Sequence, residues 1–218
     1  MNRKILTSFD HIPFFTTEAV KQLYSAENLS NGSIQTALYR WMKAGHIIQL
    51  KKGTYMTRRF YEQHRSDAEF SAAISAILIP QSYVSLEFVL QRHAILSEIT
   101  YPVTAATIKQ TRIIENSLGT FSYRNIKEVL YTGFEILDYM GIPFSQATLA
   151  KALFDYLYLR PLPRNWLPSD FNLGEELRLN IDGFSEQDQT RFSEFVEISK
   201  SKKMQNILKN LRKTVWQH

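Results

Sequence analysis

Residues 30–56 read SNGSIQTALYRWMKAGHIIQLKKGTYM, and this stretch decides the expected fold of the N-terminal part of the chain. Its apolar residues first recur at helical spacing, which predicts an amphipathic helix ending at Gly45, where a left-handed C-cap costs glycine little. Two short runs follow, His46–Leu50 and Thr54–Thr57, joined by the turn 51–53, and they predict a β-hairpin. The outer face of the helix carries hydroxyl, aromatic and cationic side chains and no acid: Ser33, Thr36, Tyr39, Arg40 and Lys43.

A helix with a basic outer face, followed directly by a hairpin with a basic tip, is the pattern of a winged helix-turn-helix. Before it, we expect short helices at residues 3–9 and about 16–24 and a turn over residues 25–33. These elements together predict a DNA-binding domain over residues 1–58. The polar, basic stretch 58–66 is expected to be a linker.

Each side chain of this surface suits a particular contact with double-stranded DNA. The guanidinium group of Arg40 matches the two acceptors of a guanine edge. The hydroxyl groups of Ser33, Thr36 and Tyr39 can bond to phosphates or bases, whereas lysines give affinity and register through phosphates. The alternative is an ordinary solvated helix face with surface lysines. The lysines assigned to phosphates are Lys43, Lys51 and Lys52.

The composition indicates a packed globular protein and excludes several classes of site. Hydrophobic residues make up 44% of the chain and aromatic residues 13%. Its length of 218 residues is enough for one large domain or two small ones. The chain has no cysteine, and its five histidines show no HxxxH or HExxH spacing, so we expect no metal. A glycine-rich phosphate loop and a Gly-x-Ser-x-Gly motif are absent, so we expect no cofactor and no enzyme activity. Without an apolar run long enough to span a bilayer, a cytoplasmic protein with no membrane partner is expected.

Charge is distributed unevenly along the chain. Residues 1–66 carry ten Lys and Arg against four Asp and Glu, and residues 199–218 carry six against none. Residues 67–198 carry ten against seventeen, so two basic ends surround an acidic middle. The C-terminal cations form either a second phosphate-binding or docking face, with Trp216 stacking beside them, or the solvated side of an amphipathic helix. They are Lys200, Lys202, Lys203, Lys209, Arg212 and Lys213.

Residues 67–218 are expected to form a second domain, so that the whole chain belongs to the α+β class. A helix begins near Asp67, and residues 82–95 hold another. Short segments rich in β-branched and aromatic residues then predict a small antiparallel sheet over about residues 101–144. A helix follows at about 145–159. The C-terminal part, 168–215, reads as three helices at about 168–180, 185–198 and 202–215.

Four sequence blocks, in the same order along the chain, carry a resemblance to a known family. They are MKAGHIIQLKKGTYM, SYVSLEFVLQRHAILSEI, LGTFSYRNIK and ATLAKALFDYLYL, at residues 42–56, 82–99, 118–127 and 147–159. Together they resemble the AbiEi-type antitoxins of abortive-infection toxin–antitoxin systems, over about residues 10–160. The resemblance implies a cytoplasmic bacterial protein that represses its own operon and counters a nucleotidyltransferase-like toxin encoded beside it. Ala150 departs from the family, whose members often have an acid before the lysine of the last block.

Lys151 and Asp155 lie four residues apart on the helix of the last block, a spacing that permits a surface ion pair. They match positions of the family block, so a contact between domains or with a partner is the functional role we expect. A catalytic role is not expected of them.

Three classes of function remain after this reading. The leading hypothesis is an antitoxin that binds operator DNA, represses its own operon and neutralises a toxin, either by direct binding or through the toxin's target. The alternative is a stand-alone winged-helix transcriptional regulator whose second domain binds a ligand or mediates dimerisation. A nucleic-acid-modifying enzyme would need a cluster of catalytic carboxylates, which the sequence does not show.

Overall fold

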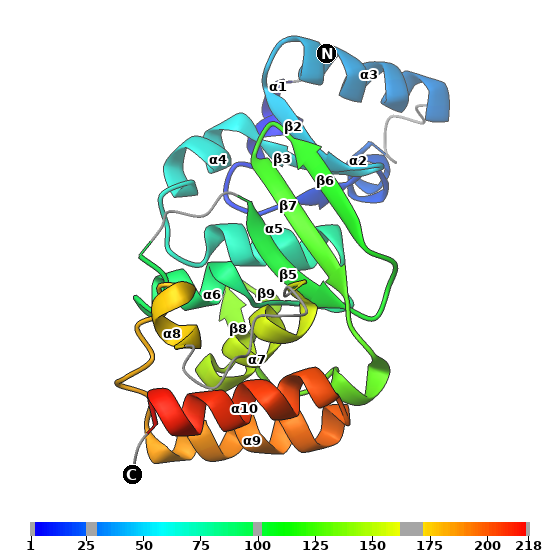
Figure 1. The fold of residues 1–218 in the computed structure, drawn as a ribbon. Helices are drawn as coiled ribbons and strands as arrows, with labels where there is room; N and C mark the ends of the chain where they lie inside the picture. The colour runs from blue at the N-terminus through cyan, green and yellow to red at the C-terminus, as the bar shows by residue number, and fades with distance from the viewer. Residues whose placement is uncertain (1–2, 25–29, 98–101, 162–171, 217–218) are drawn as a thin grey trace.

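The computed structural model describes residues 3–24, 30–97, 102–161 and 172–216, and it shows an elongated α+β molecule. The N-terminal helices and a small sheet lie at one end, and the two long C-terminal helices lie at the other (Figure 1). A six-stranded sheet with helices on both faces occupies the space between them.

The N-terminal end combines three helices with a three-stranded antiparallel sheet of order β1-β3-β2. The predicted helix and hairpin lie where the sequence places them. The predicted turn over residues 25–33 is wrong in its last part, because Ser30 accepts a hydrogen bond from the backbone N–H of Ser33 and starts the helix there. Residues 25–29 lie outside the described part. The elements are α1 (Arg3–Thr7), β1 (Phe15–Thr16), α2 (Thr17–Leu23), α3 (Asn31–Lys43), β2 (Ile47–Lys51) and β3 (Thr54–Thr57).

The β2–β3 hairpin lies between two hydrophobic cores, because side chains alternate across a strand. Ile47 and Tyr55 point into a small core made with the buried face of α3. Ile48, Leu50 and Met56 point the other way, into the large core of the rest of the chain. The hairpin therefore joins the two parts of the molecule through packed side chains.

The stretch 58–66, predicted to be a linker, forms helix α4 (Arg58–His64). Thr57 caps this helix by accepting a hydrogen bond from the backbone N–H of Phe60 at 3.1 Å. The ring of Phe60 is completely buried in the large core. One buried aromatic residue in a polar stretch anchors this helix, and so small an apolar signal is easily read as a linker.

The large sheet has the strand order β6-β7-β5-β4-β9-β8. Its β6–β7, β5–β4 and β9–β8 pairs are antiparallel, and its β7–β5 and β4–β9 pairs are parallel. The prediction of an antiparallel sheet over about residues 101–144 is therefore wrong in part, because β5 and β7 of this range pair in parallel. The sheet is also larger than predicted, because β4 comes from earlier in the chain and β9 continues to Ala147. The strands are β4 (Ser82–Val84), β5 (Val103–Thr107), β6 (Arg112–Asn116), β7 (Gly119–Asn125), β8 (Phe134–Tyr139) and β9 (Ile142–Ala147).

Helices cover both faces of this sheet. Tyr139 of β8 contacts Phe70 of α5, whereas Phe134 stacks on Tyr83, whose hydroxyl group reaches Asp155 of α7. Phe134 and Tyr139 lie on opposite faces of β8, so α5 and α7 do as well. The helical elements are α5 (Phe70–Leu78), α6 (Glu87–Arg92), η2 (Glu128–Leu130), α7 (Leu149–Leu159), α8 (Leu173–Glu176), α9 (Glu186–Ser199) and α10 (Lys202–Thr214).

Two predicted helices differ from the structure. Residues 82–95 begin with the strand β4, and only Glu87–Arg92 are helical. The helix expected at 168–180 starts outside the described residues, and its described part is the single turn α8. The last helix is confirmed, with Met204, Ile207 and Leu211 buried against the large core. Within the described ranges, no helix is both long and apolar enough to cross a membrane.

Candidate nucleic-acid interface

The outer face of α3 presents exposed hydroxyl, aromatic and cationic side chains together. Ser33, Thr36, Arg40 and Lys43 are all exposed, and 56% of Tyr39 is exposed. The ammonium group of Lys43 lies 5.7 Å from the centre of the Tyr39 ring, so the two side chains stand together on this face. The structure thus brings all five predicted residues of the helix onto one accessible surface.

The hydroxyl groups near the start of α3 form hydrogen bonds within its first turns and still face the solvent. Ser30 and Ser33 share a hydrogen bond of 3.0 Å between their side chains, and Thr36 donates to the carbonyl oxygen of Gly32 at 2.9 Å. Hydroxyl groups of this kind retain acceptor capacity, and that of Ser33 can also turn toward a ligand. They lie in the first two turns, where the helix dipole favours an anion.

The opposite face of α3 fixes the helix in place. Ile34, Leu38 and Trp41 are buried in the small core beside Val20 and Tyr55. Because these side chains are packed on several neighbours, α3 presents its outer face with a defined orientation. A rigid element of this kind suits recognition of a regular surface such as a DNA groove.

The positive charge of this surface has no carboxylate partner in the part of the chain that the structure describes. The ion pairs there do not involve Arg40, Lys43 or Lys52. An uncompensated cluster of cations raises the local potential and attracts a polyanion. Lys52, at the tip of the hairpin, is also exposed and has no ion-pair partner among the described residues.

Lys51 has a different environment from its neighbour. Its ammonium group donates to the carbonyl oxygen of Ile77 at 2.5 Å and lies 3.5 Å from that of Leu78, at the C-terminal end of α5. A lysine at a helix C-terminus bonds to carbonyls that the helix itself leaves without a partner. Lys51 therefore joins the hairpin to α5 through its ammonium group, although the residue as a whole is exposed, as Lys52 is.

The C-terminal cations lie at the other end of the molecule from α3 (Figure 1). Lys203 is half-buried and donates to the carbonyl oxygens of Tyr158 and Arg160 at 2.7 and 2.9 Å, and this burial lowers the pKa of its ammonium group. Arg212 donates to the hydroxyl group of Ser193 at 3.1 Å. The remaining members of the group are exposed: Lys200, Lys202, Lys209 and Lys213.

Trp216 is not available for stacking on a base. Its ring is 4% exposed, stacks on Phe184, and donates from Nε1 to the carbonyl oxygen of Ile181 at 3.2 Å. The second basic group therefore lacks the aromatic side chain that the sequence suggested for it, because the end of the chain folds back onto the core.

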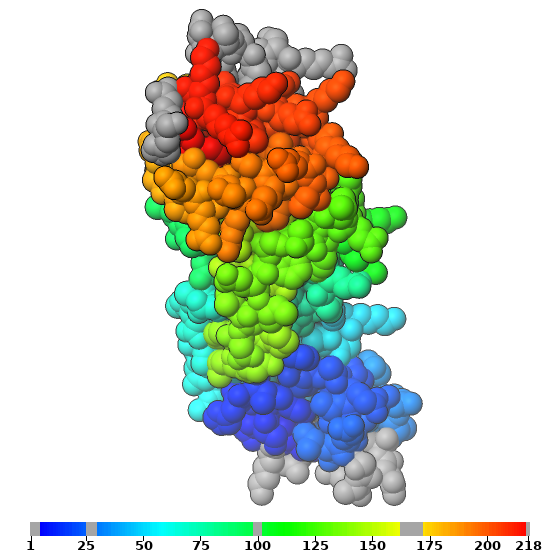
Figure 2. Space-filling view, turned by 90° about the horizontal axis from the view of Figure 1, so that it is seen from below, coloured from blue at the N-terminus to red at the C-terminus, as the bar shows by residue number. Residues whose placement is uncertain are grey.

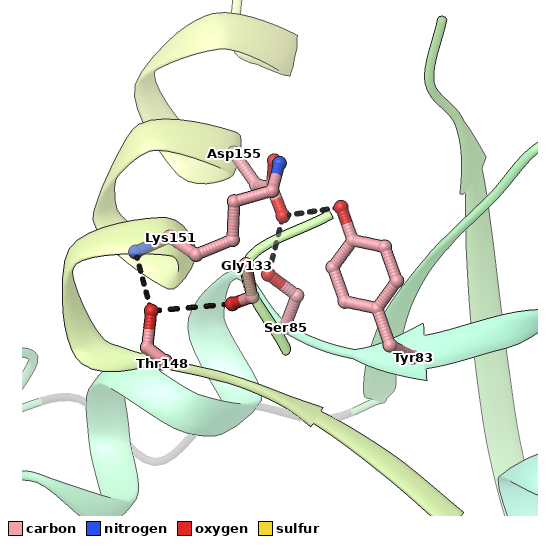
Figure 3. Close-up of polar contacts among 6 residues, drawn as sticks. All are labelled: Tyr83, Ser85, Gly133, Thr148, Lys151 and Asp155. Atoms are coloured by element: carbon pink, nitrogen blue, oxygen red, sulfur yellow. Dashed lines mark hydrogen bonds and ion pairs between the residues drawn. The ribbon is translucent and has the colours of Figure 1, made fainter. Parts of the chain in front are cut away.

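Lys151 and Asp155 form an ion pair, but the prediction that it lies on the surface is wrong. Both side chains have 0% exposure, and Asp155 also accepts hydrogen bonds from Tyr83 at 2.9 Å and Ser85 at 2.7 Å (Figure 3). The rest of the Lys151 ammonium group is surrounded by the rings of Tyr83, Phe154 and Phe195. The pair is the centre of a buried polar cluster between α7 and the sheet.

Opposing effects act on the charges of this cluster. Burial raises the pKa of Asp155 and lowers the pKa of Lys151, because it disfavours both charged forms. The attraction between the two groups and the donors from Tyr83 and Ser85 act in the other direction. Since no side-chain surface of the pair is exposed, a substrate cannot reach it without opening the fold. The cluster positions α7 and gives no accessible catalytic group.

Sequence reasoning missed the roles of Tyr83 and Ser85, because it placed both inside or beside a helix. Ser85 lies within the range 82–95 that was expected to hold a helix, whereas its hydroxyl group donates to Asp155. The sequence Ser-Tyr-Val at the start of this segment favours a strand, but three residues are too few to show a period of two. No group of three or more metal-ligating side chains occurs within the described ranges.

A comparison with models of protein families and another with curated proteins found no match to this chain.

Proposed function

We propose that the protein binds double-stranded DNA through the outer face of α3 and the tip of the β2–β3 hairpin, as a winged helix-turn-helix. The observation that carries this proposal is the exposed cluster on α3, where Arg40 and Lys43 have no carboxylate partner among the described residues. The proposal is also supported by the buried face of α3, whose packing in the small core holds the helix rigidly enough to enter a major groove.

Within this proposal, each residue has a distinct task. Arg40 reads a guanine through two parallel hydrogen bonds, and Ser33, Thr36 and Tyr39 contact phosphates or neighbouring bases. Lys43 and Lys52 contact phosphates and supply affinity that depends on salt. Lys51 is left out of the DNA surface because α5 binds its ammonium group.

We further propose, from the resemblance to AbiEi-type antitoxins, that the DNA is the operator of the protein's own operon and that the protein counters a nucleotidyltransferase-like toxin. The part of the chain outside the DNA-binding surface would then neutralise the toxin, either by binding it or by acting on its target. The alternative is a stand-alone transcriptional regulator. A toxin-type gene adjacent to this one favours the first proposal, and its absence favours the second.

The test is fluorescence anisotropy with the upstream promoter of the gene and with a scrambled duplex, at several salt concentrations. We expect tighter binding to the promoter, and we expect Arg40→Ala to lose about 1–3 kcal/mol of discrimination at one base pair. Arg191→Ala is the matched control, since Arg191 is exposed on α9 at the other end of the molecule. Equal binding of wild type to both duplexes would contradict the operator proposal, and negligible binding to both would contradict DNA binding itself.

A further inference from the structure

Strand β8 forms one edge of the six-stranded sheet, and its outer side has no neighbouring strand among the described residues. Asp138 lies opposite Pro143 of β9, and proline has no N–H to donate, so this pair is not hydrogen-bonded. Hydrogen-bonded and non-hydrogen-bonded pairs alternate along two antiparallel strands. In agreement with this, the backbone N–H of Thr148 donates to the carbonyl oxygen of Gly133 at 3.0 Å, just beyond the strands. The backbone groups that point away from β9 are those of Phe134, Ile136 and Asp138.

This edge carries the exposed carboxylates of Glu135 and Asp138, but it lacks two other usual protections against pairing with another strand. Its sequence, FEILDY, contains no lysine and no proline. Ile136 is 73% exposed, and exposed apolar side chains lie just before and just after the strand, Val129 at 61% and Met140 at 48%. These three belong to the eight large apolar side chains that are exposed in the described residues. Such a concentration at one sheet edge marks an interaction surface.

The edge is accessible along its length. Figure 2 shows the segment around β8 as a lime strip on the surface, with the blue N-terminal part at one end and the orange α9 at the other. The contacts agree with this placement. Near the start of β8, a Cβ added at Gly133 would lie 2.5 Å from the ring of Phe195 in α9, and at its end Tyr139 bonds to Asp67 beside α4.

We propose that two copies of this chain associate by antiparallel pairing of β8 with β8, about a two-fold axis at Ile136. In this register Ile136 faces Ile136 of the second copy, Glu135 faces Leu137, and Phe134 faces Asp138. No two like charges lie directly opposite each other, whereas moving the axis to residue 135 sets Glu135 against Glu135, and moving it to residue 137 sets Ile136 against Asp138. The strand is therefore complementary to itself in this register.

The ends of the strip are also complementary across this axis. Antiparallel pairing places the N-terminal part of one copy beside α9 of the other. Residues 1–66 carry an excess of six positive charges, whereas α9 contains Glu186, Asp188, Glu194 and Glu197 and a single arginine. Met140 of one copy also comes next to residue 132 of the other, close to Val129. The acids of α9 and the apolar surface favour a second copy as the occupant of the edge, whereas the cations of α10 at the same end have the opposite charge.

This interface goes beyond the proposed DNA binding, which one α3 helix can perform alone. A two-fold dimer carries two such helices in a fixed relation, and this suits an operator with two related half-sites. Loss of the dimer leaves the basic surface of each copy intact. Failure of the dimer proposal and failure of DNA binding are therefore separate results.

The first test is sedimentation velocity on the full chain over a series of concentrations. We expect wild type to form dimers, and we expect Ile136→Lys to raise the dissociation constant about tenfold or more, because it sets two cations together on the axis. Ile113→Lys is the matched control, because Ile113 is 64% exposed on β6, at the opposite edge of the sheet. A monomeric wild type, or equal effects of the two substitutions, would overturn the proposal.

A second test fixes the register and does not depend on a folding defect. The chain has no cysteine, so a single introduced thiol can form only a disulfide between copies. With Ile136→Cys, the paired Cα atoms are about 5.5 Å apart, within the range of a disulfide, and oxidation should cross-link most of the protein. Glu135→Cys faces Leu137 and should cross-link poorly. Cross-linking of the second variant in preference to the first would show that β8 does not pair in this way.

Discussion

Lys51 and Lys52 are identical side chains at adjacent positions, and the fold gives them different tasks. Both residues are exposed, but the ammonium group of Lys51 bonds to the end of α5. We predict that Lys52→Ala flattens the dependence of DNA affinity on salt by about one unit, with little change in stability. Lys51→Ala should instead lower the free energy of unfolding by about 1 kcal/mol. Anisotropy titrations and urea unfolding measure the two effects.

Each lysine is the control for the other in that experiment. If Lys51→Ala flattened the salt dependence as much as Lys52→Ala, the hairpin tip would contact DNA through both residues. The bond to α5 would then have to break on binding.

The pair of Lys151 and Asp155 tests how a buried charge is tolerated. Removing one partner leaves the other buried without compensation, so we predict that Lys151→Met lowers the free energy of unfolding by about 3–5 kcal/mol. The double variant Lys151→Met/Asp155→Leu should recover part of that loss, since no charge is then left in the core. Urea unfolding of the two single variants and the double variant gives the coupling energy. Additive losses would show that the pair is not coupled.

At the scale of the elements, Gly133 lets β8 approach α9. Its φ is +78°, and an added Cβ would lie 2.5 Å from the Phe195 ring and 3.1 Å from the Lys151 side chain. We predict that Gly133→Ala lowers the free energy of unfolding by about 2–4 kcal/mol, from backbone strain and a steric clash together.

Gly141 is the matched control for this substitution. Its φ is +81°, and no atom lies within 4 Å of an added Cβ. Gly141→Ala should therefore show the backbone strain alone, about 1–2 kcal/mol, when thermal unfolding of both variants is measured. Equal losses at the two positions would mean that α9 yields to the added methyl group without cost.

A hydrogen-bonded carboxylate links the turn between α4 and α5 to β8. Asp67 accepts from the Tyr139 hydroxyl group at 2.6 Å and pairs with His64 at 2.9 Å, and these bonds lower the pKa of Asp67. The resulting stability is present above the unfolded pKa of about 3.9 and is lost as the pH falls through the lower folded pKa. We predict that wild type loses more stability than Asp67→Asn on acidification below that value. Thermal unfolding at a series of acidic pH values measures the difference, and parallel curves would contradict the prediction.

Elements with a strong local pattern were predicted well, and elements that depend on distant contacts were not. Helix α3 and the β2–β3 hairpin follow from apolar spacing and a glycine in a short segment. Helix α4 depends on one buried ring, Phe60, in a polar stretch, and strand β4 has only three residues. Neither is long enough to show a period, so only their packing partners define them.

At the scale of the whole molecule, the last helix is structural. Met204, Ile207, Leu211 and Trp216 are all buried in the large core. We predict that deletion of residues 200–218 exposes this part of the core and yields an aggregated or largely unfolded protein, which light scattering and circular dichroism measure. A folded, monodisperse truncation would show that the core of the remaining chain closes without α10, and that only the cations of this segment matter.

Amino-acid order alone was enough to establish the α+β class, the uneven charge, the amphipathic α3 and the basic hairpin. These properties depend on residues close together in the chain, whose spacing shows which face of an element is apolar. Tertiary structure decided that the Lys51 ammonium group bonds to the end of α5, that Lys151 and Asp155 are buried, and that β8 lies at the sheet edge. The physical reason is that a sequence pattern shows that a side chain needs a partner, whereas only the packing of distant segments determines which partner it meets.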